Sequence, residues 1–406
     1  MKPREVFQTI RLRSRPRDRR ARILASCHDV GDVRRQAQRA LPRSVFDYVE
    51  GGADEETTTR RNVAAFRSWQ FQPRPLVDVS IVDPTTTLLG VTLPMPMVLA
   101  PTGYTRMMHP DGEVAVARAA ASRQLPYTLS TVATTSVEDV AAAMTQVSAS
   151  SQLWMQLYLF RDREQSWRLL ERAWKNGVRV LEFSVDTAVA GFRVRDQRNG
   201  FTIPPSLSPA TVLDMGMHPR YWVSMVQAPA LTFANFTSDD GESTIAGITS
   251  QFDSALSWQD IRAVRERWRG SLAIKGPVPP DVARRARDEG VDLLHLSNHG
   301  GRQLDRCVPP VETITGVRAA VGDLPIVVDS GVRHGMDIAI AVALGADAVA
   351  IGRPYLYGLA AAGEEGVAHV IDLLAAQFAR TMQLLGVTSV AELRDAGPSL
   401  IERVRT

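Results

Sequence analysis

Short apolar runs of strand length recur along the chain beyond Pro94, separated by segments with the apolar spacing of amphipathic helices. The runs are Pro96–Gly103, Pro126–Thr131, Leu153–Leu159, Val178–Asp186, Leu272–Gly276, Val291–Ser297, Pro325–Gly331 and Ala348–Gly352. The helical patterns are Glu113–Arg123, Val137–Thr145, Glu164–Trp174, Trp258–Trp268, Asp281–Glu289, Val311–Val321, Met336–Leu344 and Gly363–Leu385. Nearly continuous apolar runs are typical of parallel strands that helices cover on both faces of a sheet. The alternation therefore predicts an α/β chain folded as a (β/α)8 barrel.

An open, doubly wound sheet is the alternative fold for alternating strands and helices. The count of strand–helix units disfavours it, as does the absence of a G-x-G-x-x-G turn after the first apolar run. We therefore expect one barrel domain over residues 29–386. An insertion interrupts it at about residues 187–257, after the fourth run, where no clear strand is visible. Compact domains rarely leave so long a segment without regular structure unless it has a function.

The insertion has two interpretations that the sequence leaves open. Its stretch M-G-M-H-P-R-Y-W-V-S-M-V, beginning at Met215, mixes Met, Trp and Tyr with basic residues, as segments that lie in a membrane interface do. A lid over a binding site, or a contact between subunits, fits the same stretch equally well.

The two ends of the chain differ from the barrel in character. Residues 1–28 form a basic arm, in which Glu5 and Asp18 are the only acidic residues. We expect this arm to be a flexible solvated tail, or else to be attracted to an anionic membrane surface. The pattern from Asp32 to Leu41 predicts a short N-terminal helix that ends at Pro42. Residues 387–406 are interpreted as a C-terminal tail.

Composition excludes little. Of 406 residues 45% are hydrophobic and 22% charged, which is typical of soluble globular proteins, and a net charge of +3 gives no reason to expect nucleic acid as a partner. The two cysteines, Cys27 and Cys307, suggest neither a disulfide framework nor a metal cluster. No apolar run approaches the roughly 20 residues that span a bilayer, and no secretory signal is visible. We expect a cytoplasmic protein that binds no metal.

Polar residues or glycines stand at the end of every predicted strand. In chain order they are Ala100, Pro101, Thr102 and Gly103, then Ser130, Gln156, Tyr158, Ser184, Asp186, Lys275, Ser297, His299, Arg302, Asp329, Ser330, Gly331, Arg333, Gly352 and Arg353. Barrel enzymes carry their chemistry at the rim where strands end and the following loops begin. Groups scattered at random along the strands would not gather there, so we predict an active site at this rim.

The rim residues divide into sets with different chemistry. The residues after the seventh and eighth strands, the usual phosphate site of this fold, are Gly331, Arg333, Gly352 and Arg353. The residues that offer donors and acceptors to a flat polar ring are Ser130, Gln156, Ser184 and Lys275. A lysine beside such a ring would stabilise negative charge that develops on it. FMN fits these sets better than NAD does, because only one phosphate site is visible.

The remaining candidate residues describe a substrate. Arg193 and Arg302 can hold a carboxylate, and Tyr48 and Tyr158 can hydrogen-bond a hydroxyl or carboxylate oxygen. His299 is the candidate base, and Asp186 could orient its imidazole and stabilise the imidazolium. Asp186 could instead be an ion-pair partner of Arg193, and the sequence does not decide between these roles.

Several motifs together carry a family resemblance. They are L-A-P-T-G from Leu99, Q-L-Y from Gln156, S-N-H-G-G-R-Q-L-D from Ser297, V-D-S-G-V-R from Val328 and I-G-R-P from Ile351. With them the chain resembles the FMN-dependent 2-hydroxy-acid oxidase and dehydrogenase family from about Val30 to about Leu385. That family includes glycolate oxidase, the quinone-linked L-lactate dehydrogenases and (S)-mandelate dehydrogenase.

The resemblance implies roles for individual residues. It implies that FMN is the cofactor, with Lys275 by the flavin N1–O2 edge, and that His299 is the base with Asp186 as its partner. It also implies oxidation of an L-2-hydroxy acid to the 2-oxo acid, with quinone or another acceptor, or alternatively oxygen, taking the electrons. A homo-oligomer, a tetramer in the family, and a peripheral contact with the inner face of the plasma membrane are further implications.

Two departures bear on the substrate. Where glycolate oxidase has a tryptophan this chain has Val132, so the pocket is more open and glycolate is a less suitable substrate. Gly103 stands where oxidases of the family often carry alanine, which points toward the dehydrogenases. Two other functions stay open. The first is a different FMN barrel enzyme, such as an isomerase or a nucleotide dehydrogenase. The latter needs a cysteine nucleophile, but Cys307 comes after the H-G-G-R turn and is interpreted as incidental. The second is a partner-binding barrel without catalysis, which the set of His299, Arg302 and Asp186 disfavours.

Overall fold

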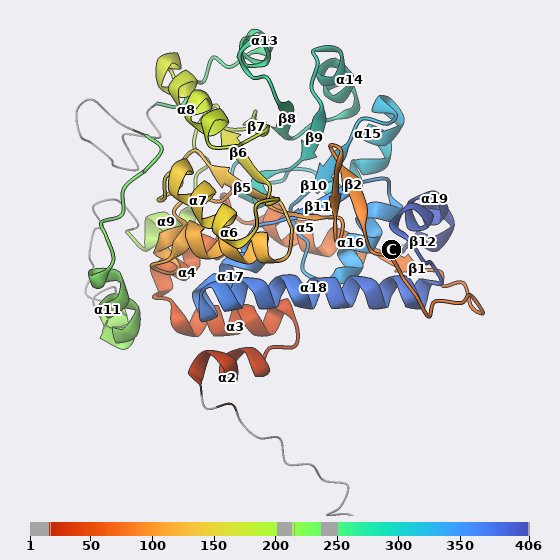
Figure 1. Cartoon of the computed structure of the whole chain (residues 1–406), viewed down its shortest axis with the longest axis horizontal. Coiled ribbons are helices and arrows are strands. Elements are labelled where there is room, and N and C mark those ends of the chain that lie inside the picture. The colour runs from red at the N-terminus through yellow and green to blue at the C-terminus, as the bar shows by residue number, and fades with distance from the viewer. Residues whose placement is uncertain (1–15, 17, 201–212, 215, 237–250, 405–406) are drawn as a thin grey trace, which may run out of the picture.

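The predicted barrel is confirmed in the computed structural model, which describes residues 16, 18–200, 213–214, 216–236 and 251–404 (Figure 1). Parallel strands close on themselves in the order β10-β11-β4-β5-β6-β7-β8-β9. Their bounds are Met97–Leu99 (β4), Tyr127–Ser130 (β5), Leu153–Leu157 (β6), Val180–Ser184 (β7), Ser271–Gly276 (β8), Leu293–Leu296 (β9), Ile326–Val328 (β10) and Ala348–Ile351 (β11). Almost every residue of these strands is buried, as their apolar sequences predict.

A helix follows each strand. The helices are Gly112–Ser122 (α6), Val137–Val147 (α7), Arg163–Lys175 (α8), Trp258–Arg267 (α13), Pro280–Asp288 (α14), Ile314–Val321 (α15), Gly335–Ala343 (α16), Arg353–Ala362 (α17) and Glu364–Leu385 (α18). All but one match a predicted pattern. The exception is α17, which is buried on nearly all sides and so lacks the alternation of apolar and polar residues that marks a surface helix.

The interior of the barrel is filled in layers. The lowest layer is apolar, and the hairpin of β2 (Thr86–Leu88) and β3 (Val91–Leu93) packs against it; it comprises Val98, Trp154, Val180, Ala273, Leu293, Val327 and Ala348. Side chains of one strand face the same way at every second residue. Two residues further along five of these strands the inward side chains are polar and buried, namely Gln156, Glu182, Lys275, His295 and Asp329. The site therefore stands on a closed, packed floor.

Helices of the N-terminal segment pack beside the barrel in an arrangement that the sequence patterns showed only in part. The predicted short helix is confirmed as α3 (Val30–Ala40), and α4 (Arg43–Glu50) and α5 (Thr57–Arg67) follow it. The prediction of a flexible arm over residues 1–28 is wrong for Arg19–Ala25, which form helix α2. The side chain of Asp18 caps α2 by accepting a hydrogen bond from the backbone N–H of Ala21, at 2.7 Å. Residues 1–15 and 17 lie outside the described part of the chain.

The C-terminal segment is not a tail. Residues Val390–Leu400 form helix α19, which packs against α16. Strand β12 (Ile401–Arg403) pairs antiparallel with β1 (Trp69–Phe71), which directly follows α5. The end of the chain is thus tied back to the N-terminal layer by hydrogen bonds between residues more than 300 positions apart in sequence.

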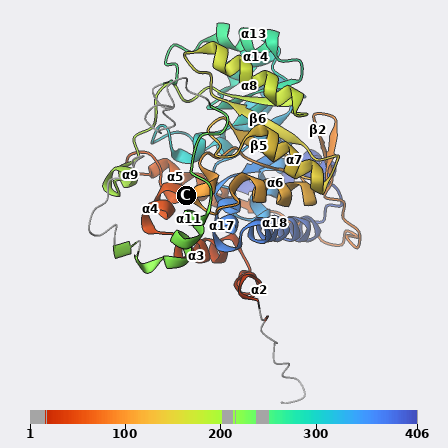
Figure 2. The same ribbon diagram turned by 60° about the vertical axis from the view of Figure 1, so that its left-hand side comes forward.

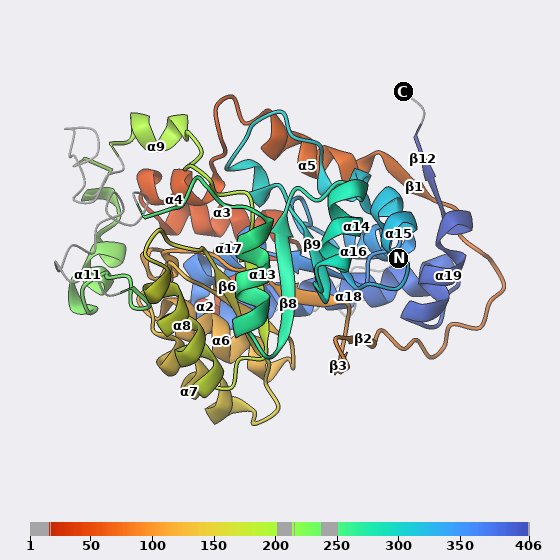
Figure 3. The ribbon, with the colours of Figure 1, turned by 90° about the horizontal axis from the view of Figure 1, so that it is seen from above.

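The insertion after β7 contains helices α9 (Val194–Arg198), which lies beside α4, and α11 (Pro219–Gln227), which lies further out on the same side of the molecule (Figures 2 and 3). Asp47 of α4 anchors α9 by accepting hydrogen bonds from Arg195 at 3.2 Å and from Asn199 at 2.9 Å. Part of the insertion, residues 201–212, 215 and 237–250, lies outside the described residues. No helix in the described part of the chain is long and apolar enough to cross a membrane.

Candidate active site

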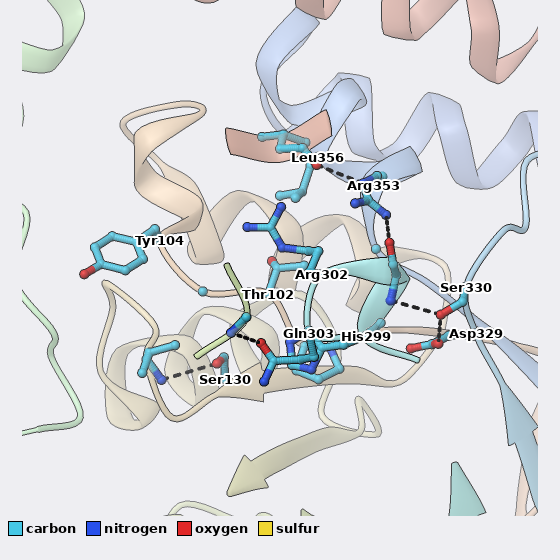
Figure 4. Close-up of a pocket in the computed structure, with 18 of the residues that line it drawn as sticks. Thr102, Tyr104, Ser130, His299, Arg302, Gln303, Asp329, Ser330, Arg353 and Leu356 are labelled. Atoms are coloured by element: carbon cyan, nitrogen blue, oxygen red, sulfur yellow. Dashed lines mark hydrogen bonds between the residues drawn. The ribbon is translucent and has the colours of Figure 1, made fainter. Parts of the chain in front are cut away.

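One cavity of about 560 Å³ lies where the strands end and collects most of the predicted site residues (Figure 4). Those that line it are Tyr48, Ala100, Pro101, Thr102, Gly103, Ser130, Tyr158, Arg193, Lys275, His299, Arg302, Asp329, Ser330, Gly331, Arg333, Gly352 and Arg353. Four other predicted residues are buried beside the lining instead: Gln156, Ser184, Asp186 and Ser297. The rim predicted from the strand ends is therefore a single cavity, and the four buried residues support its walls.

The candidate base stands in a backbone turn that few residues can adopt. His299, Gly300 and Gly301 follow β9 with φ angles of 58°, 66° and 76°, all in the left-handed region. The two glycines are needed because a side chain at Gly300 would meet the guanidinium of Arg353, and one at Gly301 would meet the backbone of Thr59. The surrounding structure must hold His299 in this strained conformation, and residues held in this way are concentrated at functional sites.

Asp186 is the partner of His299 and not of Arg193. Its carboxylate oxygen Oδ2 lies 3.1 Å from Nδ1 of His299, and the hydroxyl of Tyr158 lies 3.4 Å from Nε2 on the other side of the ring. Burial alone would raise the pKa of Asp186, but the His299 imidazole in contact with it brings that pKa below its usual value. Arg193 donates instead to Asp196 at 2.6 Å, a residue that the sequence patterns did not single out.

Two arginines make one wall of the cavity strongly positive. Nη1 of Arg302 donates to the carbonyl of Tyr48 at 2.6 Å and to that of Gly51 at 2.9 Å, which fixes the direction of the guanidinium. The guanidinium carbons of Arg302 and Arg193 lie 4.9 and 6.0 Å from the ring centre of Tyr48. Burial, and next the like charge of Arg193, lower the pKa of Arg302 to about 10. A bound carboxylate would offset both the burial of the Arg302 charge and its repulsion by Arg193, so this wall is suited to an anion.

Two sets of hydrogen-bonded polar groups lie at the ends of five neighbouring strands. Ser130 Oγ donates to Oε1 of Gln156 at 3.1 Å, and Nε2 of Gln156 donates to Oγ of Ser184 at 3.0 Å. Lys275 on the next strand donates to Oγ of Ser297 at 3.0 Å. Burial would lower the pKa of Lys275, but Asp329, whose carboxylate lies 3.5 Å away, raises it above the usual value. The lysine is thus a fixed positive charge at the floor of the cavity.

The predicted phosphate end of the cavity differs from expectation in one respect. Arg353 donates to the backbone carbonyls of Val49, Gly51 and Gly300, so three of its five N–H groups serve to join α4 and the His299 turn to α17 (Figure 4). The guanidinium of Arg333 donates only to the neighbouring carbonyl of Val332 among the described residues. Helix α17 begins at Arg353, so its first backbone N–H groups add to the donors for an anion at this end.

Comparison with known proteins decides the family. A family model described as FMN-dependent dehydrogenase matches residues 37–401. The chain belongs to this family. An L-lactate dehydrogenase of Caulobacter vibrioides is 40% identical over 385 residues, which cover 92% of this chain and 97% of that protein. An (S)-mandelate dehydrogenase of Pseudomonas putida is 39% identical over 368 residues, which cover 90% and 92% of the two chains.

Solved structures agree with this assignment. The crystal structure of the monotopic membrane protein (S)-mandelate dehydrogenase has a TM-score of 0.88 to this FMN-dependent dehydrogenase, with 38% identity, and the match covers 93% of this chain and 99% of that one. A mandelate oxidase variant with (S)-mandelic acid has a TM-score of 0.77 with 35% identity, over 91% and 97% of the two chains. Both structures confirm the fold that the sequence predicts.

The residues of this dehydrogenase fit FMN. Apart from the carboxylate wall of Arg302 and Arg193, the cavity has an end suited to a phosphate, at Arg333 and the start of α17. Between these regions lie ring-directed donors and acceptors that include the charged Lys275. Ser130 and Lys275 both line the cavity, so the ring and the phosphate would lie in one continuous space. Within the described ranges no group of His, Cys, Asp and Glu side chains could hold a metal ion.

The sequence patterns missed the aromatic residues that the insertion brings to the cavity. Phe233 and Phe252 both line it, together with Tyr104 and Phe192. Phe233 meets Tyr104 edge to face with ring centres 4.5 Å apart, and Phe252 lies 5.0 Å from Tyr158. No periodic pattern marks these positions, because they fold over the barrel from a segment without regular structure. Their aromatic character was the only signal in the sequence.

Proposed function

We propose that this FMN-dependent dehydrogenase oxidises an L-2-hydroxy acid to the corresponding 2-oxo acid. The observation that carries the proposal is the contact between His299 and Asp186 beside the cationic wall of Arg302 and Arg193, because a base and a carboxylate site then share one cavity. When bound, FMN would accept the two electrons and one of the two protons that the substrate loses. The naming of relatives as L-lactate and (S)-mandelate dehydrogenases supports the proposal.

Each side chain of the site has a part in this reaction. Arg302 and Arg193 bind the substrate carboxylate, and Arg302 orients it because its own guanidinium is held by two backbone carbonyls. Nε2 of His299 takes one proton from the substrate, while Asp186 at Nδ1 stabilises the imidazolium that forms. The hydroxyl of Tyr158 lies beside Nε2 of His299 and so hydrogen-bonds the end of the substrate from which His299 takes the proton. The ring of Tyr48 lies under the guanidinium groups of both arginines.

The apolar part of the cavity favours a substrate with an aryl or similarly bulky side chain. Tyr104, Val132, Phe233 and Phe252 line the cavity, and a small methyl group as in lactate would leave much of this wall without contact. Aromatic pairs contribute about 0.5–1.5 kcal/mol beyond the area they bury. We therefore propose (S)-mandelate and related aryl hydroxy acids as better substrates than L-lactate.

An anaerobic screen tests the activity. The FMN-loaded protein is mixed with (S)-mandelate, (R)-mandelate, L-lactate and glycolate, and flavin absorbance is followed. The absorbance should fall fastest with (S)-mandelate and should not change with the (R) enantiomer. If dithionite reduces the flavin but none of the L-2-hydroxy acids does, the proposed activity is wrong, although the family assignment stands.

A pair of variants tests the substrate class. Phe233→Leu should lower kcat/KM for (S)-mandelate by roughly 2–10-fold, the value of one aromatic contact, and leave kcat/KM for L-lactate nearly unchanged. Phe236→Leu is the matched control, because Phe236 lies in the same segment and is buried against Phe160 outside the cavity lining. Equal losses for both acids in the Phe233 variant would mean that Phe233 does not distinguish them.

We further propose that the enzyme passes its electrons to quinone at a membrane surface that it contacts peripherally. Support comes from α11 and the residues just before it, where large apolar side chains are exposed: Leu213, Met217, Val223 and Val226. A neighbouring groove of about 430 Å³ is lined by Arg19, Arg20, Arg39 and Arg220. Exposed apolar residues beside cations are what an anionic bilayer surface binds.

Vesicle binding and turnover with acceptors test this second proposal. The double variant Val223→Ser/Val226→Ser should bind phosphatidylglycerol vesicles less well than the unmodified enzyme, and Leu384→Ser, an equally exposed apolar site on α18, should bind normally. Oxygen uptake as fast as quinone reduction would favour the oxidase alternative. A lid or a subunit contact, the other interpretations of the insertion, would be indicated if the double variant changed KM or the oligomeric state but not vesicle binding. Tetrameric assembly stays a prediction.

A further inference from the structure

Two buried ionisable residues beneath the cavity have no part in the reaction described above. Glu182 on β7 and His295 on β9 are both 0% exposed, and neither lines the cavity. Both point into the barrel, because they stand two residues beyond Val180 and Leu293 of the inner apolar layer. Burying an ionised group in such a place costs several kcal/mol unless a partner compensates it.

The two residues form one end of a continuous chain of charges. Nδ1 of His295 lies 3.0 Å from Oε1 of Glu182, and Nε2 lies 3.3 Å from Oδ2 of Asp329. The same Oδ2 atom of Asp329 lies 3.5 Å from the ammonium of Lys275, which lines the cavity. Asp329 is thus shared between a lysine that faces the cofactor site and a histidine that faces away from it.

The charges of this chain balance only while His295 carries its proton. Burial would lower the pKa of His295, but Glu182 and Asp329 raise it to about 9, so the imidazolium persists at neutral pH. Burial would raise the pKa of Asp329, and Lys275 and His295 together bring it far below its usual value. The two carboxylates, Glu182 and Asp329, and the two cations, His295 and Lys275, together make a neutral set. Because His295 also pairs with Asp329, this carboxylate neutralises less of the positive charge of Lys275.

We propose that Glu182 and His295 are positioning residues that hold Asp329 and thereby set the electrostatic potential that Lys275 presents to the flavin ring. This inference rests on the placement of the ring beside Lys275. It predicts effects of opposite sign, because removing Glu182 leaves a net positive charge in the chain and removing His295 leaves a net negative one. A unit charge about 10 Å away, at an effective dielectric constant of about 20, changes an equilibrium on the ring by roughly tenfold.

Sulfite, an anion that adds to oxidised flavins, is the probe. Its dissociation constant is measured with FMN-loaded enzyme by loss of flavin absorbance, alongside the midpoint potential of the flavin. Glu182→Gln at about pH 6 should bind sulfite roughly tenfold more tightly than the unmodified enzyme at the same pH, with a higher potential. His295→Gln at about pH 8 should bind it roughly tenfold more weakly, with a lower potential. The double variant Glu182→Gln/His295→Gln should return close to the unmodified enzyme.

The opposite signs separate this role from a merely structural one. Glu113→Gln is the matched control, because Glu113 on α6 is a carboxylate that is also 0% exposed and hydrogen-bonds Thr134 outside the charge chain. It should alter stability without altering the sulfite constant. Weaker sulfite binding in both single variants, or no change in either, overturns the proposal. If His295→Gln fails to retain FMN, the sign of the Glu182→Gln shift alone decides. A protein that binds no FMN at all would instead refute the placement of the ring.

Discussion

The Asp186→Asn variant tests the base assignment most directly, because it keeps the shape of the site and removes one charge. Oδ2 of Asp186 lies 3.1 Å from Nδ1 of His299. When His299 takes a proton, the two charges are centred about 4 Å apart and, at an effective dielectric constant of about 20, attract by about 4 kcal/mol. The asparagine retains a neutral hydrogen bond of about 1 kcal/mol. The remaining loss of about 3 kcal/mol corresponds to roughly a hundredfold lower kcat.

Anaerobic stopped-flow measurement of flavin reduction by the best hydroxy acid gives this quantity without interference from the acceptor. The flavin spectrum confirms that FMN is retained. Asp196→Asn is the control, since Asp196 is a carboxylate of the same cavity that pairs with Arg193 at 2.6 Å; it should raise KM and leave the reduction rate nearly unchanged. A reduction rate in Asp186→Asn within about threefold of the unmodified enzyme would refute the view that Asp186 stabilises the imidazolium.

Three further outcomes follow from the same geometry. His299→Gln should retain FMN while turnover, measured with the best acid, falls by roughly 10²–10⁴-fold, and near-normal turnover would make His299 a structural residue. Arg302→Met should lose both kcat and kcat/KM because orientation is lost with the charge, whereas Arg193→Met should mainly raise KM; unchanged steady-state kinetics in Arg302→Met would contradict the carboxylate site. Because Glu182 and Asp329 raise the pKa of His295 to about 9, the protonated His295 stabilises the folded state fully below about pH 6.5. This stabilisation is lost as the pH rises through about 9. The unfolding temperature should therefore fall over this range more steeply than in Glu182→Gln/His295→Gln, and parallel profiles would disprove it.

Much of the fold was predictable because the barrel is built from local signals. Each strand is an apolar run, and most of the covering helices have one polar face. Helix α17 escaped prediction because it is buried nearly all round, so its sequence lacks an amphipathic period. Strands β1 and β12 are only three residues each, and nothing in either sequence names a partner more than 300 residues away. For that reason the sequence did not reveal that the C-terminal segment is structured.

The types of residue in the site were determined by the sequence, because parallel strands of a closed barrel deliver their last residues to one rim. Partners were not. Asp186 could pair with His299 or Arg193, and only the folded turn after β9 brings His299 to it.

Likewise, only the tertiary structure turns three N–H groups of Arg353 toward backbone carbonyls and brings Phe233 over the cavity. It also lines up Glu182, His295, Asp329 and Lys275 from neighbouring strands. The physical reason is that strand and helix patterns depend on spacings of a few residues, whereas an ion pair depends on distances of about 3 Å between atoms from distant segments.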